Sequence, residues 1–425
     1  MILPTNTMLL TELGDFEWRL SVGMDAALRS VKSEKPSSIM KIKKVHLANV
    51  EVVSNPRWQS RQILKGIVRI FTLVATIVAL PAHEVLAFAV TETRVLPFPI
   101  EKASTIPFNG DVNPYGVAFV PENFPTGGKL NPGDLLVSNF NNFNNIQGTG
   151  TTIIDISAGG STSLFFQGTA PLGLSTGLAV LRAGFVLVAN CPTNNQPPVA
   201  GAAAGSLLLI DGNGNLVNTF TSSEIQGPWD FSVYDQGGTV WVFVSNAING
   251  TVARIELVFT GGNFALKSAT TIASGYTHHA DPATFEVAPT GSAFDSQNGV
   301  LYVASTGDNA VYAVPNALNL RSSKGTGTIV YADQAHLHGA LAMVFGPNGD
   351  LLVSNSDEFN TDPNQPSEIV EFTVKGQFIG EISVDPNLGG AFGLKASKVT
   401  DNVYHFAAVD DNANNITIWT LNAGN

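Results

Sequence analysis

The chain of 425 residues has little charge, and that charge is unevenly distributed. Residues 1–89 hold 11 basic and 7 acidic side chains, whereas residues 90–425 hold 11 basic and 27 acidic ones. Phosphate groups are bound by clustered lysine and arginine, so the acidic second part is not expected to bind nucleic acid. Disorder is excluded as well, because 44% of the residues are hydrophobic and can form a large core.

Cysteine and helical patterns are also scarce. The one cysteine, Cys191, cannot form an internal disulfide, so the fold must be stabilised by burial alone. Cys191 follows a strand-like run and is interpreted as a small buried residue. No stretch after residue 90 keeps an apolar period of 3.6, while 41 glycines and 23 prolines favour many turns. The second part is therefore predicted to be all-β.

One uninterrupted apolar run, residues 70–80, resembles the core of an export signal. Its 11 residues are too few to span a bilayer comfortably, and Arg57, Arg61, Lys65 and Arg69 precede it. Ala87-Phe88-Ala89 then supplies a small-x-small cleavage pattern. We expect residues 1–89 to be a leader that engages the membrane transiently and is cleaved after Ala89, with an uncleaved anchor as the alternative. The mature protein would then be secreted or periplasmic.

A strand that ends in a short polar step recurs six times after residue 90, at intervals of 50 to 59 residues. The six copies are Leu136–Asn139, Leu187–Asn190, Phe243–Asn246, Tyr302–Ser305, Leu352–Asn355 and Phe406–Val409. An apolar strand precedes each copy and another follows it, and five of the six continue into a fourth strand. Four antiparallel strands repeated about every 50 residues are typical of a β-propeller blade. The sequence therefore predicts a six-bladed β-propeller over residues 90–425.

The sixth blade lacks its outer strand because the sequence ends soon after the third. A propeller must close, since an open edge would expose unpaired backbone groups. Residues 90–100 can supply the missing strand, where Pro97 and Pro99 are tolerable at an outer edge. We therefore expect an N-terminal strand to close the last blade.

Two segments carry a resemblance to a known family. Gly346–Asn355 and Leu301–Val311 resemble NHL repeats, in which a hydrophobic strand leads into a turn rich in Asp and Asn. They are also similar to gluconolactonase-like propellers, and the likeness extends over roughly residues 90–421. It implies six blades and either a binding scaffold or a metal-dependent lactonase, lyase or hydrolase. The lactonase type carries an acidic ligand near its first inner strand, where this chain has Asn113-Pro114-Tyr115-Gly116 instead.

Propeller topology predicts where a ligand would bind. Loops that connect strands two and three, and those that connect one blade to the next, open on the same face. In this sequence these loops are rich in Asn and His. They would bring the following residues together at the channel mouth: Asn113, Tyr115, Asp230, His278, His279, Asp281, His336 and His338. A small molecule or a protein would bind at that face.

Two sets of residues are candidate metal ligands, although neither has the spacing of a standard motif. Imidazole and carboxylate groups suit a divalent ion such as Zn²⁺ or Mn²⁺. At the channel mouth these groups belong to His278, Asp281, His336 and His338. Alternatively, these histidines bond loop backbones. A surface Ca²⁺ could bind Asp357, Asn360 and Asp362, or that loop could be a plain solvated insertion.

Three functions remain open at this point. The first is an exported binding or interaction module that uses the channel mouth. The second is an enzyme of the lactonase, lyase or hydrolase type with a metal ion at that mouth. The third is a scaffold without a small ligand, whose channel mouth would be plugged by aromatic or aliphatic side chains.

Overall fold

The computed structural model describes residues 7–9, 19–21, 101–170, 172–193, 196–197, 204–356, 359, 369–384 and 389–422. The chain divides into two compact units, Met1–Val90 and Thr91–Asn425. In the first unit, β1 (Thr7–Leu9) pairs antiparallel with β2 (Arg19–Ser21). The predicted signal segment and Ala89 lie outside the described residues. Among the residues that are described, none belongs to a helix long and apolar enough to cross a membrane.

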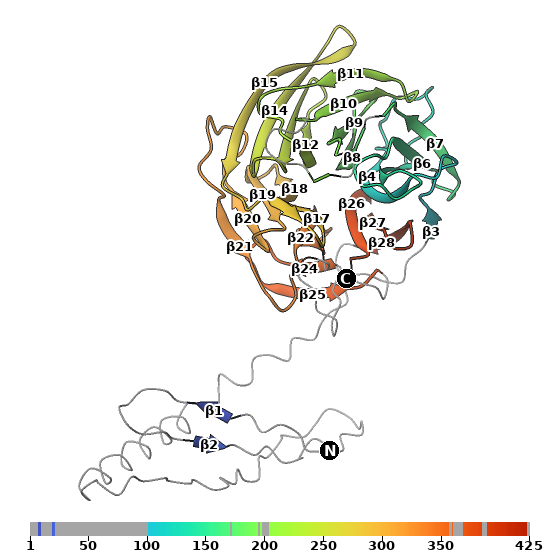
Figure 1. Cartoon of the computed structure of the whole chain (residues 1–425). Helices are drawn as coiled ribbons and strands as arrows, with labels where there is room; N and C mark the ends of the chain where they lie inside the picture. Colours follow the sequence, from blue (N-terminus) through green and yellow to red (C-terminus); the bar gives the residue numbers. More distant parts are fainter. Residues whose placement is uncertain are drawn as a thin grey trace, which may run out of the picture. The chain divides into compact units, whose positions relative to one another are not determined.

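The second unit is a six-bladed β-propeller of four-stranded antiparallel sheets, which confirms the predicted fold (Figure 1). Blade 1 comprises β4 (Val112–Phe119), β5 (Leu135–Asn141), β6 (Thr152–Ile156) and β7 (Thr162–Gln167). Blade 2 comprises β8 (Leu174–Leu181), β9 (Phe185–Asn190), β10 (Ser206–Asp211) and β11 (Leu216–Phe220). Blade 3 comprises β12 (Pro228–Asp235), β13 (Thr239–Asn246), β14 (Thr251–Thr260) and β15 (Asn263–Ser274).

The remaining three blades follow the same order along the chain. Blade 4 comprises β18 (Pro289–Asp295), β19 (Val300–Ser305), β20 (Ala310–Val314) and β21 (Thr328–Tyr331). Blade 5 comprises β22 (Ala340–Phe345), β23 (Leu351–Asn355), β24 (Ile369–Phe372) and β25 (Phe378–Ile382). Blade 6 comprises β26 (Ala391–Thr400), β27 (Val403–Asp410), β28 (Asn415–Asn422) and β3 (Glu101–Ser104). A short hairpin of β16 (His279–Asp281) and β17 (Phe285–Val287) precedes blade 4.

The ring closes as predicted, through an N-terminal strand added to blade 6. That strand is β3, which pairs antiparallel with β28, so that Ala103 lies opposite Ile416. It begins at Glu101, just after the stretch 90–100 in which the sequence placed it. Proline has no amide hydrogen to donate to a neighbouring strand. The described pairing starts at Glu101, after Pro97 and Pro99. The innermost strands β4, β8, β12, β18, β22 and β26 contact one another in sequence, and β26 contacts β4.

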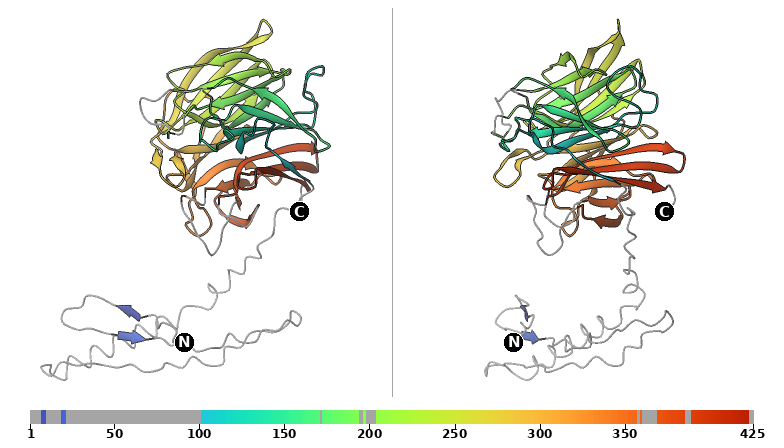
Figure 2. Two further views of the ribbon diagram at one scale, coloured as in Figure 1. Left: turned by 45° about the vertical axis from the view of Figure 1, so that its right-hand side comes forward. Right: turned by 90° about the vertical axis from the view of Figure 1, so that its right-hand side faces the viewer.

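Most of the hydrophobic core lies between neighbouring blades. Six clusters of buried side chains fill the six interfaces between blades, and a seventh lies at the centre of the ring. The sheets stand side by side around the axis and present both faces to their neighbours (Figure 2). This arrangement explains why the second strand of each blade is an apolar run rather than an alternating one, because a strand buried on both faces needs apolar side chains on both.

Each of the six innermost strands has a β-bulge near its start. Glycine allows the backbones of adjacent blades to come very close at this level. A Cβ on Gly393 would lie 1.8 Å from the carbonyl oxygen of Tyr115, and one on Gly291 would lie 2.5 Å from that of Leu341. At these two positions the backbones of adjacent blades therefore leave no room for a side chain.

The asparagines at the ends of the second strands have a structural role. Asn190 Oδ1 accepts a hydrogen bond from the amide of Gly173 at 3.0 Å. Asn355 Oδ1 does the same for the amide of His338 at 2.9 Å. Each asparagine thus ties a second strand to the loop that leads into its own blade. Repetition of this residue reflects the repeated fold and not a repeated ligand site.

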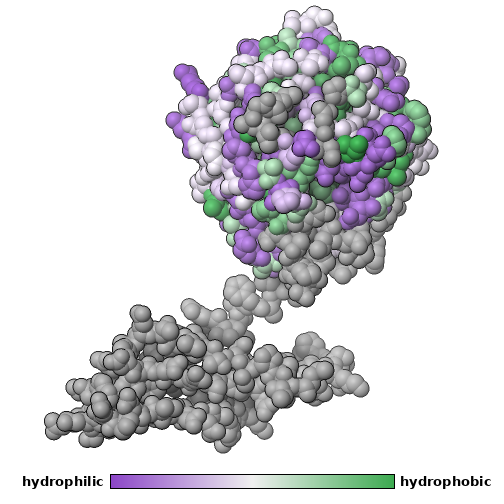
Figure 3. Space-filling model, in the orientation of Figure 1, coloured by the Kyte–Doolittle hydropathy of each residue, from purple (hydrophilic) through white to green (hydrophobic). Residues whose placement is uncertain are grey.

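The surface has no uniform character on the face drawn in Figure 3, where polar and apolar residues are intermixed. Large exposed apolar side chains of the described residues include Phe108, which is 84% exposed, and Phe143, which is 68% exposed. Single exposed apolar residues are usual on soluble proteins, so they do not indicate a site by themselves.

Candidate functional site

The end of the channel where the inner strands begin is filled by aromatic side chains. Tyr115 stacks on Phe140 with ring centroids 4.8 Å apart and lies 4.6 Å from the ring of Phe392. Trp229 packs edge-on against Phe140 at 5.4 Å. Tyr115 and Trp229 are only 6% and 3% exposed. We call this group of rings, which belongs to the central core cluster, the aromatic plug.

The β16–β17 hairpin adds one more ring to the aromatic plug. Phe285 packs edge-on against Phe140, with centroids 6.3 Å apart. Its φ of 71° is a backbone conformation that bulky residues rarely adopt, so packing must hold it in place. The next residue, Glu286, is 6% exposed, and neither of its carboxyl oxygens has a hydrogen-bond partner among the described residues. Burial raises the pKa of Glu286 to about 9.

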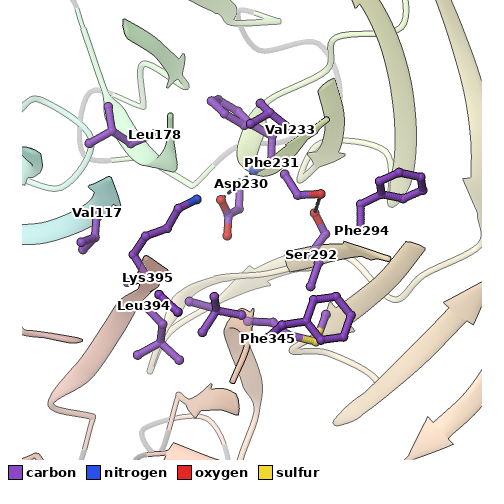
Figure 4. A pocket seen from close by; sticks show the side chains of 17 residues that line it. Val117, Leu178, Asp230, Phe231, Val233, Ser292, Phe294, Phe345, Leu394 and Lys395 are labelled. Carbon is purple, nitrogen blue, oxygen red and sulfur yellow. Dashed lines mark hydrogen bonds between the residues drawn. The ribbon is translucent and has the colours of Figure 1, made fainter. Parts of the chain in front are cut away.

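An axial cavity lies beyond the aromatic plug, among the middle portions of the inner strands (Figure 4). Its volume is about 240 Å³. Its walls come from all six inner strands and expose slightly more polar than apolar surface, with Val117, Leu178, Met343, Phe345 and Leu394 among the apolar side chains. Its polar side chains are Asp230, Lys395, Ser232 and Ser292.

Asp230 and Lys395 face each other across this axial cavity (Figure 4). Asp230 comes from β12 in blade 3 and Lys395 from β26 in blade 6, which are opposite blades of the ring. Neither side chain has an ion-pair partner within 4.0 Å among the described residues. Two groups of opposite charge thus approach each other without direct contact, and the space between them belongs to the cavity.

The surroundings shift the protonation of both groups. Burial raises the pKa of Asp230 to about 7, against the opposing effects of the Phe231 amide and the Lys395 ammonium. The Phe231 amide donates to Asp230 Oδ1 at 2.6 Å. Burial also lowers the pKa of Lys395, although the nearby Asp230 carboxylate opposes that shift. A proton can therefore be gained or lost at Asp230 close to neutral pH.

Two serines complete the polar part of the cavity. Ser292 Oγ and Ser232 Oγ, on the neighbouring inner strands β18 and β12, are hydrogen-bonded at 3.0 Å (Figure 4). With Ser292 as the donor, the hydroxyl hydrogen of Ser232 is left to point elsewhere. The cavity therefore offers a hydroxyl donor on the same side as Asp230.

The inner strands show which end of the channel is open. In β12, β18 and β22 the first four or five residues are buried, and the residues that follow are partly exposed. The same rise in exposure runs along β26 after Leu394. Water therefore reaches the cavity from the end where the inner strands finish, opposite the aromatic plug.

The structure places the expected channel-mouth residues in different surroundings. Tyr115 belongs to the aromatic plug, and Asp230 lines the axial cavity. Asn113 donates its backbone amide to Asn414 Oδ1 at 2.7 Å, at the junction of the first and last blades. Of the eight residues, only Asp230 lines the axial cavity.

The histidines of the two loops bond mainly to nearby groups in those loops. His278 Nδ1 donates to the carbonyl of Tyr276 at 3.0 Å, and His279 Nδ1 donates to that of Ala280 at 2.8 Å. His336 bonds to Asp333 at 2.5 Å. The carboxylate of Asp281 accepts hydrogen bonds from two backbone amides of its own turn. His338 is buried.

Metal binding at these loops stays a prediction. Within the described ranges, no three side chains of His, Cys, Asp or Glu are grouped closely enough to hold a metal ion. The expected surface calcium ligands Asp357, Asn360 and Asp362 lie outside the described residues.

Lys395, Ser232 and Ser292 were not among the residues that the sequence pointed to. Lys395 did carry a signal, because it is one of 11 basic residues in residues 90–425 and lies within an apolar inner strand. A charged residue at such a position must find a polar partner or an aqueous space. The two serines carry no comparable signal, since serine is common in this sequence.

No protein-family model matches this chain, and no curated protein matches it. Among solved structures, it is similar to a chain of a nidogen/laminin complex, with 11% identity and a TM-score of 0.39 over 62% of this chain and 77% of that one. It is also similar to a putative oxidoreductase (glucose dehydrogenase) from Thermus thermophilus, with 12% identity and a TM-score of 0.45 over 76% and 99%. Both likenesses are too weak to suggest an activity. The protein is a six-bladed β-propeller with a closed ring and with Asp230 and Lys395 inside its axial cavity.

Proposed function

We propose that this protein is a ligand-binding β-propeller whose axial cavity takes a small molecule. The observation that carries the proposal is the pair Asp230 and Lys395, which face each other from opposite blades without touching. Small-molecule sites are typically concave and mostly apolar, with a few polar groups that fix the orientation of the ligand. The axial cavity is concave and places the polar side chains of Asp230, Lys395, Ser232 and Ser292 beside apolar side chains.

The energetics of buried charge support the proposal. Removing an ion from water costs several kcal/mol, and direct contact with an opposite charge offsets part of that cost. Asp230 and Lys395 bear the cost of burial without direct contact. A polar ligand between them would offset that cost, which gives a physical reason for two ionisable residues at this place inside the channel.

The position of the cavity also changes the expected route of binding. The sequence placed the ligand at the mouth formed by the loops between blades, but the aromatic plug fills the channel at that end. We therefore infer that the ligand enters from the opposite end. Binding of a protein to the loop face is a separate proposal that this cavity neither requires nor excludes.

A second candidate function is acid–base catalysis in the same cavity. The pKa of Asp230, raised to about 7, suits a group that must gain and lose a proton near neutral pH. A lyase or hydrolase would use Asp230 in this way. Product formation from a bound ligand would distinguish this candidate from simple binding.

Export completes the proposed function. The apolar run at residues 70–80 and the pattern that ends at Ala89 favour a secreted or periplasmic binding protein.

A thermal-shift screen tests the proposal. The full chain would be melted with small acids, amines, sugars and neutral amides, because a ligand that binds only the folded state raises the melting temperature. Ser292→Leu would place an apolar side chain in the cavity and should abolish the shift, whereas Val399→Leu on the exposed part of β26 should not. If no class of compound raised the melting temperature, or if Ser292→Leu left the shift unchanged, the cavity would not be the site.

A further inference from the structure

We propose that the ligand of the axial cavity is a small carboxylic acid with an apolar body, and that it is bound together with one proton. This inference depends on the proposed function, because it names the class of ligand for the same cavity. It rests on which atoms of the cavity are free to donate hydrogen bonds, and on which walls remain for the rest of the molecule.

The division of the cavity into polar and apolar walls selects an amphipathic ligand. Its four polar side chains come from blades 3, 4 and 6, and the remaining walls include Val117, Leu178, Met343 and Leu394. A sugar carries hydroxyl groups on every side, and those that faced these four apolar side chains would lose their hydrogen-bond partners, at a cost for each unpaired group. A molecule with one polar end matches the cavity better.

The free hydrogen-bonding groups indicate that this polar end is an anion. Lys395 presents three ammonium hydrogens and has no ion-pair partner among the described residues. Ser232 has a hydroxyl hydrogen to donate when its oxygen accepts from Ser292. Asp230 Oδ1 already accepts the Phe231 amide, so Oδ2 is the oxygen that can carry a proton. Ammonium, hydroxyl and carboxylic acid together make three donors for the two oxygens of a carboxylate.

The charges around Asp230 explain why a proton would accompany the ligand. Lys395 on β26 is the charged group that acts on Asp230. The other packed strands contribute Leu178 from β8, Ser245 from β13, Ser292 from β18 and Met343 from β22, and none of these titrates near neutral pH.

A ligand carboxylate bound to Lys395 would offset the positive charge of Lys395, which favours the ionised form of Asp230. It would also place a like charge beside Asp230, and a like charge favours protonation. Two carboxyl groups would then share one proton, an arrangement known from paired carboxylates in other sites. Above neutral pH, where free Asp230 is ionised, binding must therefore take up a proton from the solvent.

Benzoate is a suitable probe, because a cavity of about 150 Å³ can hold benzene and this one measures about 240 Å³. Calorimetric titrations of the full chain with benzoate, benzamide and benzylamine would be run at pH 6 and pH 8. Each would be repeated in buffers of different ionisation enthalpy, which reveals the number of protons exchanged. We expect benzoate to bind at least tenfold more tightly than the two other probes, and to take up nearly one proton at pH 8 and far less at pH 6.

Three variants separate the roles of the two residues. Lys395→Met should weaken benzoate binding at least tenfold, while Lys398→Met, an exposed change on the same strand, should leave it unaltered. Asp230→Asn keeps a side-chain donor toward the cavity, so it should still bind benzoate but without proton uptake. If Lys395→Met failed to fold, Asp230→Asn and the pH series would still decide the matter.

Several outcomes would overturn the proposal. Equal binding of benzamide would show that no anion is selected, and tighter binding of benzylamine would show that Asp230 binds a cation. Benzoate binding without proton uptake, or unchanged uptake in Asp230→Asn, would remove the role given to Asp230. If the thermal-shift screen found sugars or neutral amides that bind the cavity, this inference would fail while the proposed function stood. If nothing bound, both would fail.

Discussion

Glu286 gives the sharpest test of the energetics of this fold. The change is Glu286→Gln, which replaces the carboxyl group by a neutral amide of similar shape. The carboxyl group lies beside the aromatic plug and is 6% exposed, without a hydrogen-bond partner in the part of the chain that the structure describes. Its pKa is raised from 4.5 to about 9. Burial is the cause, because it disfavours the ionised form. We expect the variant to be more stable than the natural protein at neutral pH.

The magnitude follows from proton linkage. Below about pH 4.5 the group is protonated in the folded and the unfolded chain, so it costs nothing. As the pH rises from 4.5 toward 9, the unfolded chain releases a proton that the folded chain retains, and the free energy of unfolding falls. Each pH unit costs up to about 1.4 kcal/mol, which amounts to about 3 kcal/mol at pH 7. Relaxation and water entry reduce such costs, so a gain of about 2 kcal/mol for Glu286→Gln at pH 7 is realistic.

The assay is unfolding in urea at pH 4.5, 7 and 8.5, with the midpoint concentration compared between variants. The advantage of Glu286→Gln should be near zero at pH 4.5 and should grow at each higher pH. Glu122→Gln, which changes an exposed carboxylate, is the matched control and should show no such growth. An advantage that stayed constant across the three pH values would refute the reasoning, because it would show that ionisation of Glu286 is not involved.

Three further predictions concern ring closure, the cysteine and the leader. Ala103→Asp would put a carboxylate among the buried side chains between blades 6 and 1 and should lower the free energy of unfolding by roughly 3–5 kcal/mol. The exposed change Val399→Asp should lower it little. Similar melting temperatures of the two variants would argue against closure of the ring by β3. Cys191 is 1% exposed, and burial raises the pKa of its thiol to about 12. Iodoacetamide should therefore modify Cys191 only after unfolding. Rapid reaction of the folded protein at pH 8 would contradict this prediction. Amino-terminal sequencing of exported protein should start at Val90, and an intact leader would instead indicate an uncleaved anchor.

The fold could be predicted from the sequence because its signal is repeated six times. Short apolar strands such as Leu352–Asn355 recur at nearly equal intervals, and each is buried on both faces between neighbouring blades. The missing outer strand of blade 6 could be inferred as well, since a ring with an open edge is unstable. The described closing strand starts at Glu101, just after residues 90–100, where the sequence placed it.

The site was predicted less well, and the reason lies in the bulged inner strands. Sequence and topology place Asp230 at the channel, and the structure has it in the wall of the axial cavity, but a sequence pattern does not show how far along the channel a residue lies. The bulges and glycines bring the inner strands close together near Tyr115 and Gly393, and aromatic rings then fill that end. The space remains farther along the axis, where Lys395 reaches toward Asp230.

The sequence by itself determines the number of blades and the closure of the ring, because these depend on periodic burial and on the pairing of backbone groups, which repeat along the chain. Only the tertiary structure decides that Lys395 faces Asp230 across the axial cavity. These two residues are 165 positions apart and belong to opposite blades. Their approach depends on the radius of the closed ring and on the register of strands that never pair with each other. No local pattern carries that information, so the chemistry of the cavity emerges only when all six blades are in place.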